Sequence, residues 1–157
     1  MFFSILLDEF SNGHAAVVHL TDVLSARPRP VRMAGVVRWK DKPESHDYPA
    51  AASYLSLLYD AAQVTKVVAG LHAATTVTFK AKDLLRASRL ELLATDNPHV
   101  VKDLDKIDRG ERLSPVLCVR GDAERDLPLV IADGYHRICA SYHRDEDDDV
   151  PCRIVGI

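Results

Sequence analysis

The chain has 157 residues, of which 47% are hydrophobic and 27% are charged, and its formal net charge is −3 at pH 7. This composition is typical of one globular domain with a hydrophobic core. The slightly negative charge argues against a protein that wraps nucleic acid by bulk electrostatic attraction. The acidic run at 145–149 is interpreted as a solvated loop, because consecutive acids lack the alternating spacing of a calcium-binding loop.

The sequence gives no indication of a membrane or secreted protein. It contains no run of about 18 apolar residues, so we expect no membrane-spanning helix. The first residues, MFFSILLDEF, lack the basic start of a secretory signal and include acids. The cysteines Cys118, Cys139 and Cys152 have no metal-ligand spacing. We interpret them as thiols of a protein in the reducing cytoplasm.

Residues 1–48 are expected to form an N-terminal extension and linker. The segment Arg27–Pro30 cannot continue a helix, because its prolines lack an amide N–H and restrict the residues before them. An alternative hypothesis is that residues 1–32 precede the working protein, which would then start at Met33.

A helical segment is predicted over residues 49–74. Apolar residues recur at helical spacing over 49–69, and Gly70 is a good helix stop. The preceding His46-Asp47-Tyr48 has two interpretations. It is either a catalytic dyad or active-site lip, or a helix start that Asp47 caps.

From residue 75 onward, short strands and helices follow one another. Asn97, Pro98 and Gly110 are typical cap, first-position and stop residues, and they bound the most clearly marked helix. The predicted elements are a strand at 75–79, a helix at 81–93, a helix between Asn97 and Gly110, strands at 116–119 and 129–132, a helix that opens within 133–137, and a strand at 151–155. This mixture indicates an α+β or α/β fold.

The junction Asp133-Gly134-Tyr135-His136-Arg137 carries the clearest chemistry, because it lies between an apolar strand and a helix. The first amides of a helix have no partner within the helix, and the helix dipole is positive there. Gly134 allows close backbone approach, and His136 and Arg137 add donors for phosphate oxygens. The pattern therefore predicts a phosphate site. The alternative is that Asp133 only caps the helix while His136 and Arg137 pair with surface acids.

The segment 113–155 resembles the ParB/sulfiredoxin-like superfamily. The resemblance rests on LSPVLCVRG, LPLVIADGYHRICASY and VPCRIV, which reproduce the family's strand, strand with a glycine-containing helix start, and Val-Pro strand. With the preceding strand and helices it extends over residues 75–157. It implies an α+β fold with a small mixed sheet flanked by helices, here with a helical N-terminal extension.

The resemblance implies that the helix start binds nucleotide phosphates. By position, Gly134, Tyr135, His136 and Arg137 would contact the phosphates. Asp133 matches the leading acid of the pattern in free-serine kinases of this fold, so Asp133 and His136 are the candidate catalytic residues. No metal-ligating side chains are expected.

Two further residues are candidate ligands for phosphate. Lys80, just after the strand at 75–79, would neutralise its charge, and Ser114, before a proline, would donate a hydrogen bond. The alternatives are a solvated lysine and a turn serine.

The sequence also departs from the family. Tyr135 stands where a sulfiredoxin has its nucleophilic cysteine, so we expect no sulfiredoxin activity, and the alternative thiol, Cys139, is more simply a buried small side chain. No helix-turn-helix region follows the last strand before Ile157, which argues against direct DNA binding.

The leading hypothesis is a cytoplasmic nucleotide-binding protein that takes ATP, ADP or CTP with Mg²⁺. Whether it is an enzyme stays open; phosphoryl transfer or nucleotide hydrolysis is the expected chemistry if it is. The alternative is a non-enzymatic module that regulates a protein partner, or acts on DNA through that partner, with the N-terminal half as the docking surface. A ParB-like nuclease is the third hypothesis.

Overall fold

The computed structural model describes residues 35–157. The predictions for the Arg27–Pro30 segment and for a start at Met33 lie outside these residues. The described elements are β1 (Arg38–Trp39), α1 (Asp47–Leu55), α2 (Ala61–Ala73), β2 (Thr76–Lys80), α3 (Ala81–Ser88), α4 (Pro98–Asp108), β3 (Arg112–Leu113), β4 (Val116–Val119), β5 (Val130–Asp133), α5 (Tyr135–Arg144) and β6 (Asp149–Val155). No helix in this range is long and apolar enough to cross a membrane.

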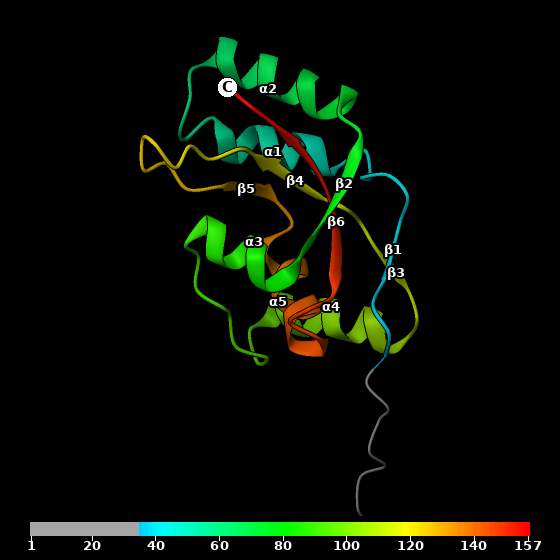
Figure 1. Cartoon of the computed structure of the whole chain (residues 1–157). Helices are drawn as coiled ribbons and strands as arrows, with labels where there is room; N and C mark the ends of the chain where they lie inside the picture. The colour runs from blue at the N-terminus through cyan, green and yellow to red at the C-terminus, as the bar shows by residue number, and fades with distance from the viewer. Residues whose placement is uncertain (1–34) are drawn as a thin grey trace, which may run out of the picture. The chain divides into compact units, whose positions relative to one another are not determined.

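A four-stranded mixed sheet organises the described part of the chain. Its strand order is β2-β6-β4-β5, with β6 parallel to β4 and the other neighbours antiparallel. In Figure 1, α1 and α2 lie on one side of the sheet, and α3, α4 and α5 lie on the other. The predicted α+β class is confirmed.

Strand β4 is central because it contributes to the hydrophobic cores on both faces of the sheet. Val116 and Cys118 belong to the core with α3, α4 and α5, whereas Leu117 and Val119 belong to the core with α1 and α2. Successive side chains of a strand point to opposite faces. A strand covered on both faces therefore needs an unbroken apolar run, and this explains the sequence VLCV.

The single helix predicted over 49–69 is wrong, because the chain forms two helices there. Helix α1 ends at Leu55, and α2 starts after Asp60, whose side chain accepts a hydrogen bond of 2.8 Å from the Gln63 amide. Leu57 fitted the helical spacing, yet it lies between the helices and is 79% exposed. Asp60 caps α2 as a typical N-cap residue does. This cap was missed because the helical spacing of apolar residues continues across it.

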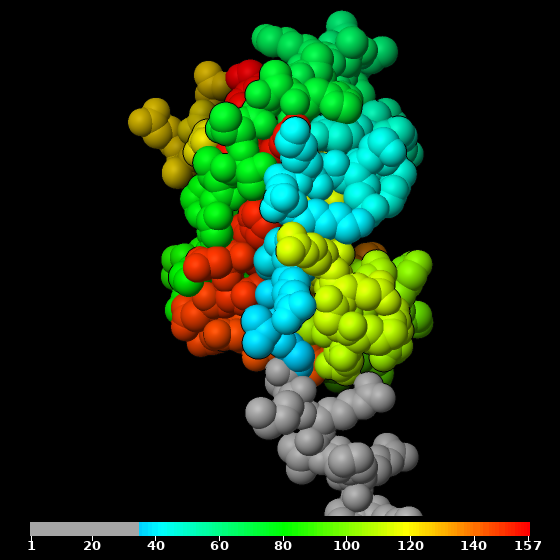
Figure 2. Space-filling model, turned by 90° about the vertical axis from the view of Figure 1, so that its right-hand side faces the viewer, coloured from blue at the N-terminus to red at the C-terminus, as the bar shows by residue number. Residues whose placement is uncertain are grey.

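Residues 35–46 were predicted as linker, but they include a strand. β1 pairs in parallel with β3, and the Lys40 amide donates to the Leu113 carbonyl at 2.8 Å. The Trp39 indole N–H donates to Asp148 at 3.3 Å. In Figure 2 this cyan segment runs between the yellow-green α4 region and the orange-red end of α5. It therefore joins parts of the chain that are distant in sequence.

The acidic run 145–149 lies beside the lysines around the start of α3. Lys80 Nζ lies 2.7 Å from Asp149, and Lys82 Nζ lies 2.5 Å from Asp147. These four side chains are largely exposed, so the pairs contribute little to stability. The run is a solvated loop whose charge is partly compensated locally.

We predict that Leu117→Ala lowers the free energy of unfolding by about 2–5 kcal/mol, because it leaves a cavity in the core beneath α1 and α2. Leu57→Ala is the matched control, and we expect a change within about 0.5 kcal/mol for this exposed leucine. Urea unfolding of the three chains measures both values. Equal effects of the two substitutions would contradict the two-faced core.

Candidate functional site

The turn between β5 and α5 requires glycine. Gly134 has φ 105°, in the left-handed region that side chains disfavour. A Cβ at this position would lie 3.0 Å from Val116 Cγ2 and 3.0 Å from Arg137 Nη2. Both the backbone conformation and the close packing therefore disfavour a larger residue here.

Helix α5 starts without a side-chain cap. Its N-cap residue is Gly134, which has no side chain to accept from the first amides. The neighbouring Asp133 was a candidate cap, but its carboxylate accepts a hydrogen bond from the Arg137 guanidinium instead. The first turn of α5 thus keeps donors for an external anion.

A buried ionic network lies directly beneath this turn. The Asp47 carboxylate, at the start of α1, is 2% exposed. It accepts hydrogen bonds from the Ser114 hydroxyl, from the Glu44 amide at 2.8 Å and from Arg137 at 3.1 Å. Arg137 thereby bridges Asp47 and Asp133. Its Nε is buried and has no hydrogen-bond partner among the described residues.

The two carboxyl groups of the network are shifted in opposite directions. Burial alone would raise the pKa of Asp47, but the Ser114 hydroxyl, the Arg137 charge and the Glu44 amide together lower it. Burial raises the pKa of Asp133, and the Asp47 charge adds to this, although Arg137 opposes the rise. Asp47 is thus the carboxylate that the network holds in its ionised form.

A cavity of about 210 Å³ opens at the start of α5. His136 lies on its α5 side, and its ring centroid is 4.6 Å from that of His99 on α4. Burial, followed by His99, lowers the pKa of His136, so its imidazole is neutral near pH 7. The lining residues are His46, Asp47, His99, Lys102, Asp103, Lys106, Asp133, Gly134, His136 and Arg137.

The cations of α4 differ in their pairing. Lys106 lies 2.8 Å from Asp103, whereas Lys102 makes no ion pair with any residue that the structure describes. Arg137 is shared between two carboxylates, so it is less available to a ligand than the sequence suggests. Lys102 is therefore the cation of this cavity best placed to meet an anion.

The structure brings together four of the predicted site residues: Asp133, Gly134, His136 and Arg137 all line the cavity. The side chains of the other three lie elsewhere. The Tyr135 hydroxyl donates to the Glu91 carbonyl.

Ser114 and Lys80 also have partners of their own. Ser114 is buried and donates to Asp47, so it supports the turn from beneath. Lys80 lies on β2, the edge strand opposite β5, and pairs with Asp149 of the neighbouring strand β6. It is separated from β5 by two strands, or about 14 Å across the sheet.

Sequence reasoning missed the α4 side of the cavity. His99, Lys102 and Lys106 follow the Asn97 cap at spacings of three and four residues, which places them on one helix face. The sequence shows this spacing, but it does not show that this face of α4 lies against the start of α5. His46 and Asp47, for which the sequence left a catalytic or lip role and a capping role open, lie in the cavity wall, and no side chain of the described residues caps α1.

Comparison of the chain with models of protein families, with curated proteins and with solved structures finds no match. Within residues 35–157, no group of three or more histidine, cysteine, aspartate or glutamate side chains is arranged to hold a metal ion. The geometry of the α5 start therefore carries the functional argument.

We predict that Gly134→Ala destabilises the protein more than Gly110→Ala does. Both glycines have positive φ, but a Cβ at Gly110 would meet nothing within 4 Å. The Gly110 variant therefore bears about 1–2 kcal/mol of backbone strain, and the Gly134 variant bears crowding against Val116 and Arg137 in addition. Urea unfolding measures the difference, and equal losses would contradict the tight turn.

We predict a pH-dependent loss of stability in Asp47→Asn. A lowered pKa means that Asp47 stabilises the fold above its ordinary value of 3.8, and that this contribution disappears as the pH falls through the folded-state pKa. The variant should lose about 1.5–3 kcal/mol near pH ~7, and this loss should shrink as the pH falls below 3.8 and through the folded-state pKa. Urea unfolding at a series of descending pH values checks this. The control is the exposed Asp41→Asn, and a loss in Asp47→Asn that is independent of pH would contradict the ionised state.

Proposed function

We propose that this chain is a cytoplasmic protein with a ParB/sulfiredoxin-like domain that binds a nucleoside di- or triphosphate at the start of α5. The observation that carries the proposal is the uncapped helix start, which opens into a cavity with Lys102, His99 and His136 on its walls. A helix N-terminus with adjacent cations favours phosphate oxygens. The cysteines of the described chain are free and buried, which fits a reducing compartment.

The cavity is too small to enclose a whole nucleotide. A volume of about 210 Å³ is smaller than the roughly 300–1,000 Å³ of clefts that enclose drug-sized ligands. The phosphates would occupy the cavity, and the nucleoside would lie at its mouth. Lys102 and the first amides of α5 would contact the phosphates, while Arg137 would hold the turn through its two carboxylates.

Mg²⁺ would enter with the nucleotide. Mg²⁺ in nucleotide sites keeps several waters and takes its remaining ligands from phosphates and one or two carboxylates. The described residues offer no metal-binding group of three acids, histidines or cysteines, so the phosphates would supply most of the non-water ligands.

A phosphotransferase or nucleotide hydrolase activity would use His136. Its neutral imidazole would take the proton of a water or small hydroxyl as that oxygen forms a bond to the terminal phosphorus. The bridging P–O bond would break, and the nucleotide would leave with the electron pair. Asp133 would act by orienting Arg137, to which it is bonded.

The alternative function, a non-enzymatic interaction module, is favoured by a different observation. Tyr54, Leu57 and Leu58 at the end of α1 are exposed apolar side chains close together in the sequence. Exposed apolar side chains that gather in one place are typical of a surface that contacts another protein. Stable association with a partner without nucleotide turnover would favour this alternative.

The binding proposal predicts a thermal shift. A nucleotide at about 100 times its dissociation constant stabilises by about 2.7 kcal/mol, which corresponds to roughly 5–10 °C for a domain of this size. The panel is ATP, ADP, CTP and GTP, each with Mg²⁺. Lys102→Gln should lose most of the shift, whereas the exposed Lys66→Gln on α2 should retain it. No shift with any nucleotide, or equal loss in both variants, would contradict the proposal.

Turnover is tested separately with His136→Gln. If the chain hydrolyses or transfers phosphate, this variant should bind nucleotide within a few-fold of the wild type and lose about 10²–10⁴ in rate. Release of inorganic phosphate and product nucleotide measures the rate. Binding without turnover in the wild type would favour the interaction module.

A further inference from the structure

A second and larger cavity lies at the other end of β5. Its volume is about 550 Å³, and α3, the connection between β4 and β5, and strands β2 and β6 form its walls. Leu129 lines this cavity just before β5, whereas Asp133 lines the first cavity at the end of β5. The two residues are about 13 Å apart along the strand. The two cavities are therefore separate sites.

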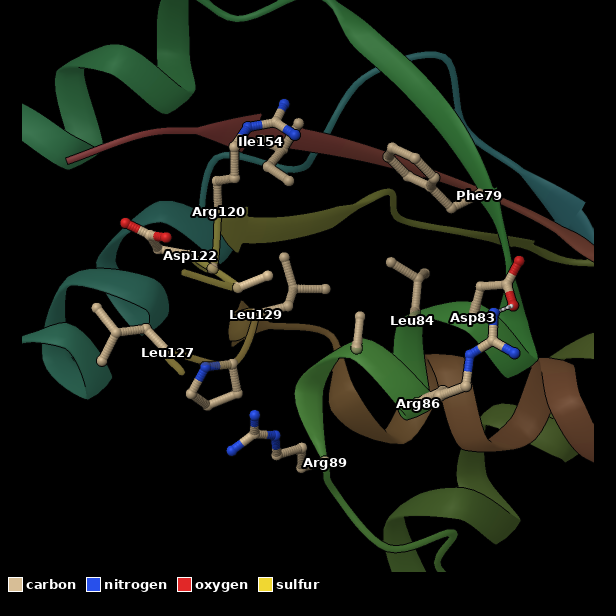
Figure 3. Close-up of a pocket in the computed structure, with 14 residues that line it drawn as sticks. Phe79, Asp83, Leu84, Arg86, Arg89, Arg120, Asp122, Leu127, Leu129 and Ile154 are labelled. Carbon is tan, nitrogen blue, oxygen red and sulfur yellow. Dashed lines mark hydrogen bonds and ion pairs between the residues drawn. The ribbon is translucent and has the colours of Figure 1, made fainter. Parts of the chain in front are cut away.

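The interior of the second cavity is mainly apolar. Figure 3 shows Phe79, Leu84, Leu129 and Ile154 facing it from four different elements, with Leu127 at its edge. Phe79 is 40% exposed and Leu127 is 55% exposed. Apolar surface that gathers in a concave site, rather than being scattered, is typical of a ligand cleft.

The connection between β4 and β5 is a built wall of this cavity. The Asp122 amide donates to the Leu127 carbonyl at 2.9 Å, and the Leu127 amide returns a bond of 2.8 Å. A Cβ at Gly121 would lie 2.5 Å from the Leu127 carbonyl oxygen, so only glycine permits this approach. The Leu129 amide donates to the Ala87 carbonyl of α3 at 3.0 Å, which ties two walls together. The cavity is thus preformed.

Three arginines surround the apolar interior, and their pairing differs. Arg86 lies 2.8 Å from Asp83, and Arg89 pairs with Asp126. Arg120 makes no ion pair or side-chain hydrogen bond with the residues that the structure describes. Its backbone is fixed, because its amide donates to the Val155 carbonyl at 2.7 Å. In Figure 3 its side chain extends from the end of β4 toward Ile154.

We propose that this cavity binds a small carboxylic acid with an apolar body, whose carboxylate pairs with Arg120. The volume lies within the roughly 300–1,000 Å³ of small-molecule clefts. One uncompensated guanidinium beside an apolar interior matches one anionic head on an apolar body, and a guanidinium can bind a carboxylate with two parallel hydrogen bonds. This site does not depend on the proposed nucleotide site.

The test uses two fluorescent probes that differ mainly in charge. Anilinonaphthalene sulfonate has an apolar body with an anionic head, and phenylnaphthylamine has the same body without the head. Arg120→Gln should weaken binding of the anionic probe about tenfold or more and leave the neutral probe within about twofold. Leu127→Ser should weaken binding of both probes. Octanoate should displace the anionic probe, and octanol should do so much less effectively.

The matched control is Arg125→Gln, which removes an exposed arginine of the same connection that does not line the cavity. It should leave both affinities unchanged. An unchanged affinity of Arg120→Gln for the anionic probe would overturn the proposal, as would an equal loss in Arg125→Gln. Displacement by an acidic peptide but not by octanoate would overturn the small-molecule assignment. Repeating the titration with ATP and Mg²⁺ present should give the same affinities.

Discussion

The buried Asp47 carboxylate is the constraint on which the α5 site depends. A charge removed from water is costly unless it is paired and hydrogen-bonded. Asp47 meets this requirement with partners from distant parts of the chain, since Ser114 is 67 residues away and Arg137 is 90 residues away. The network therefore holds α1, the segment between β3 and β4, and the first turn of α5 in one arrangement. Breaking it would leave an unpaired charge in the interior rather than at the surface.

This constraint also decides which groups remain for a ligand. Because Arg137 is shared between Asp47 and Asp133, its charge is compensated within the protein. The helix dipole of α5 and the uncompensated Lys102 on α4 are not used in this way. The turn is thus built by one set of charges, and an anion would be attracted by another. The sequence motif alone does not show whether its arginine has a structural or a ligand-binding role.

The sequence predicted the elements whose signals are local. The strand at 116–119 followed from four consecutive apolar residues, and α4 followed from its cap, its proline and its terminal glycine. The pairing of β1 with β3 was missed, because two-residue strands have no periodicity and depend on tertiary contact. The same reason explains Ser114: its sequence context shows a hydroxyl before proline, and only the fold supplies Asp47 as its partner. Local signals predicted the junction at Gly134, but not the residues of α4 across from it.

The way that individual charges are paired explains how a chain with a negative net charge can still attract anions at its two cavities. Acids of the run 145–149 pair with Lys80 and Lys82, and Asp126 pairs with Arg89. Lys102 and Arg120 have no such partner in the described chain, and each lines a cavity at one end of β5. A cation left uncompensated inside a concave site attracts anions locally even on a negative protein, because field lines concentrate in such clefts. A negative net charge argues against binding of nucleic acid by bulk attraction, but it does not exclude specific anion sites at either end of this strand.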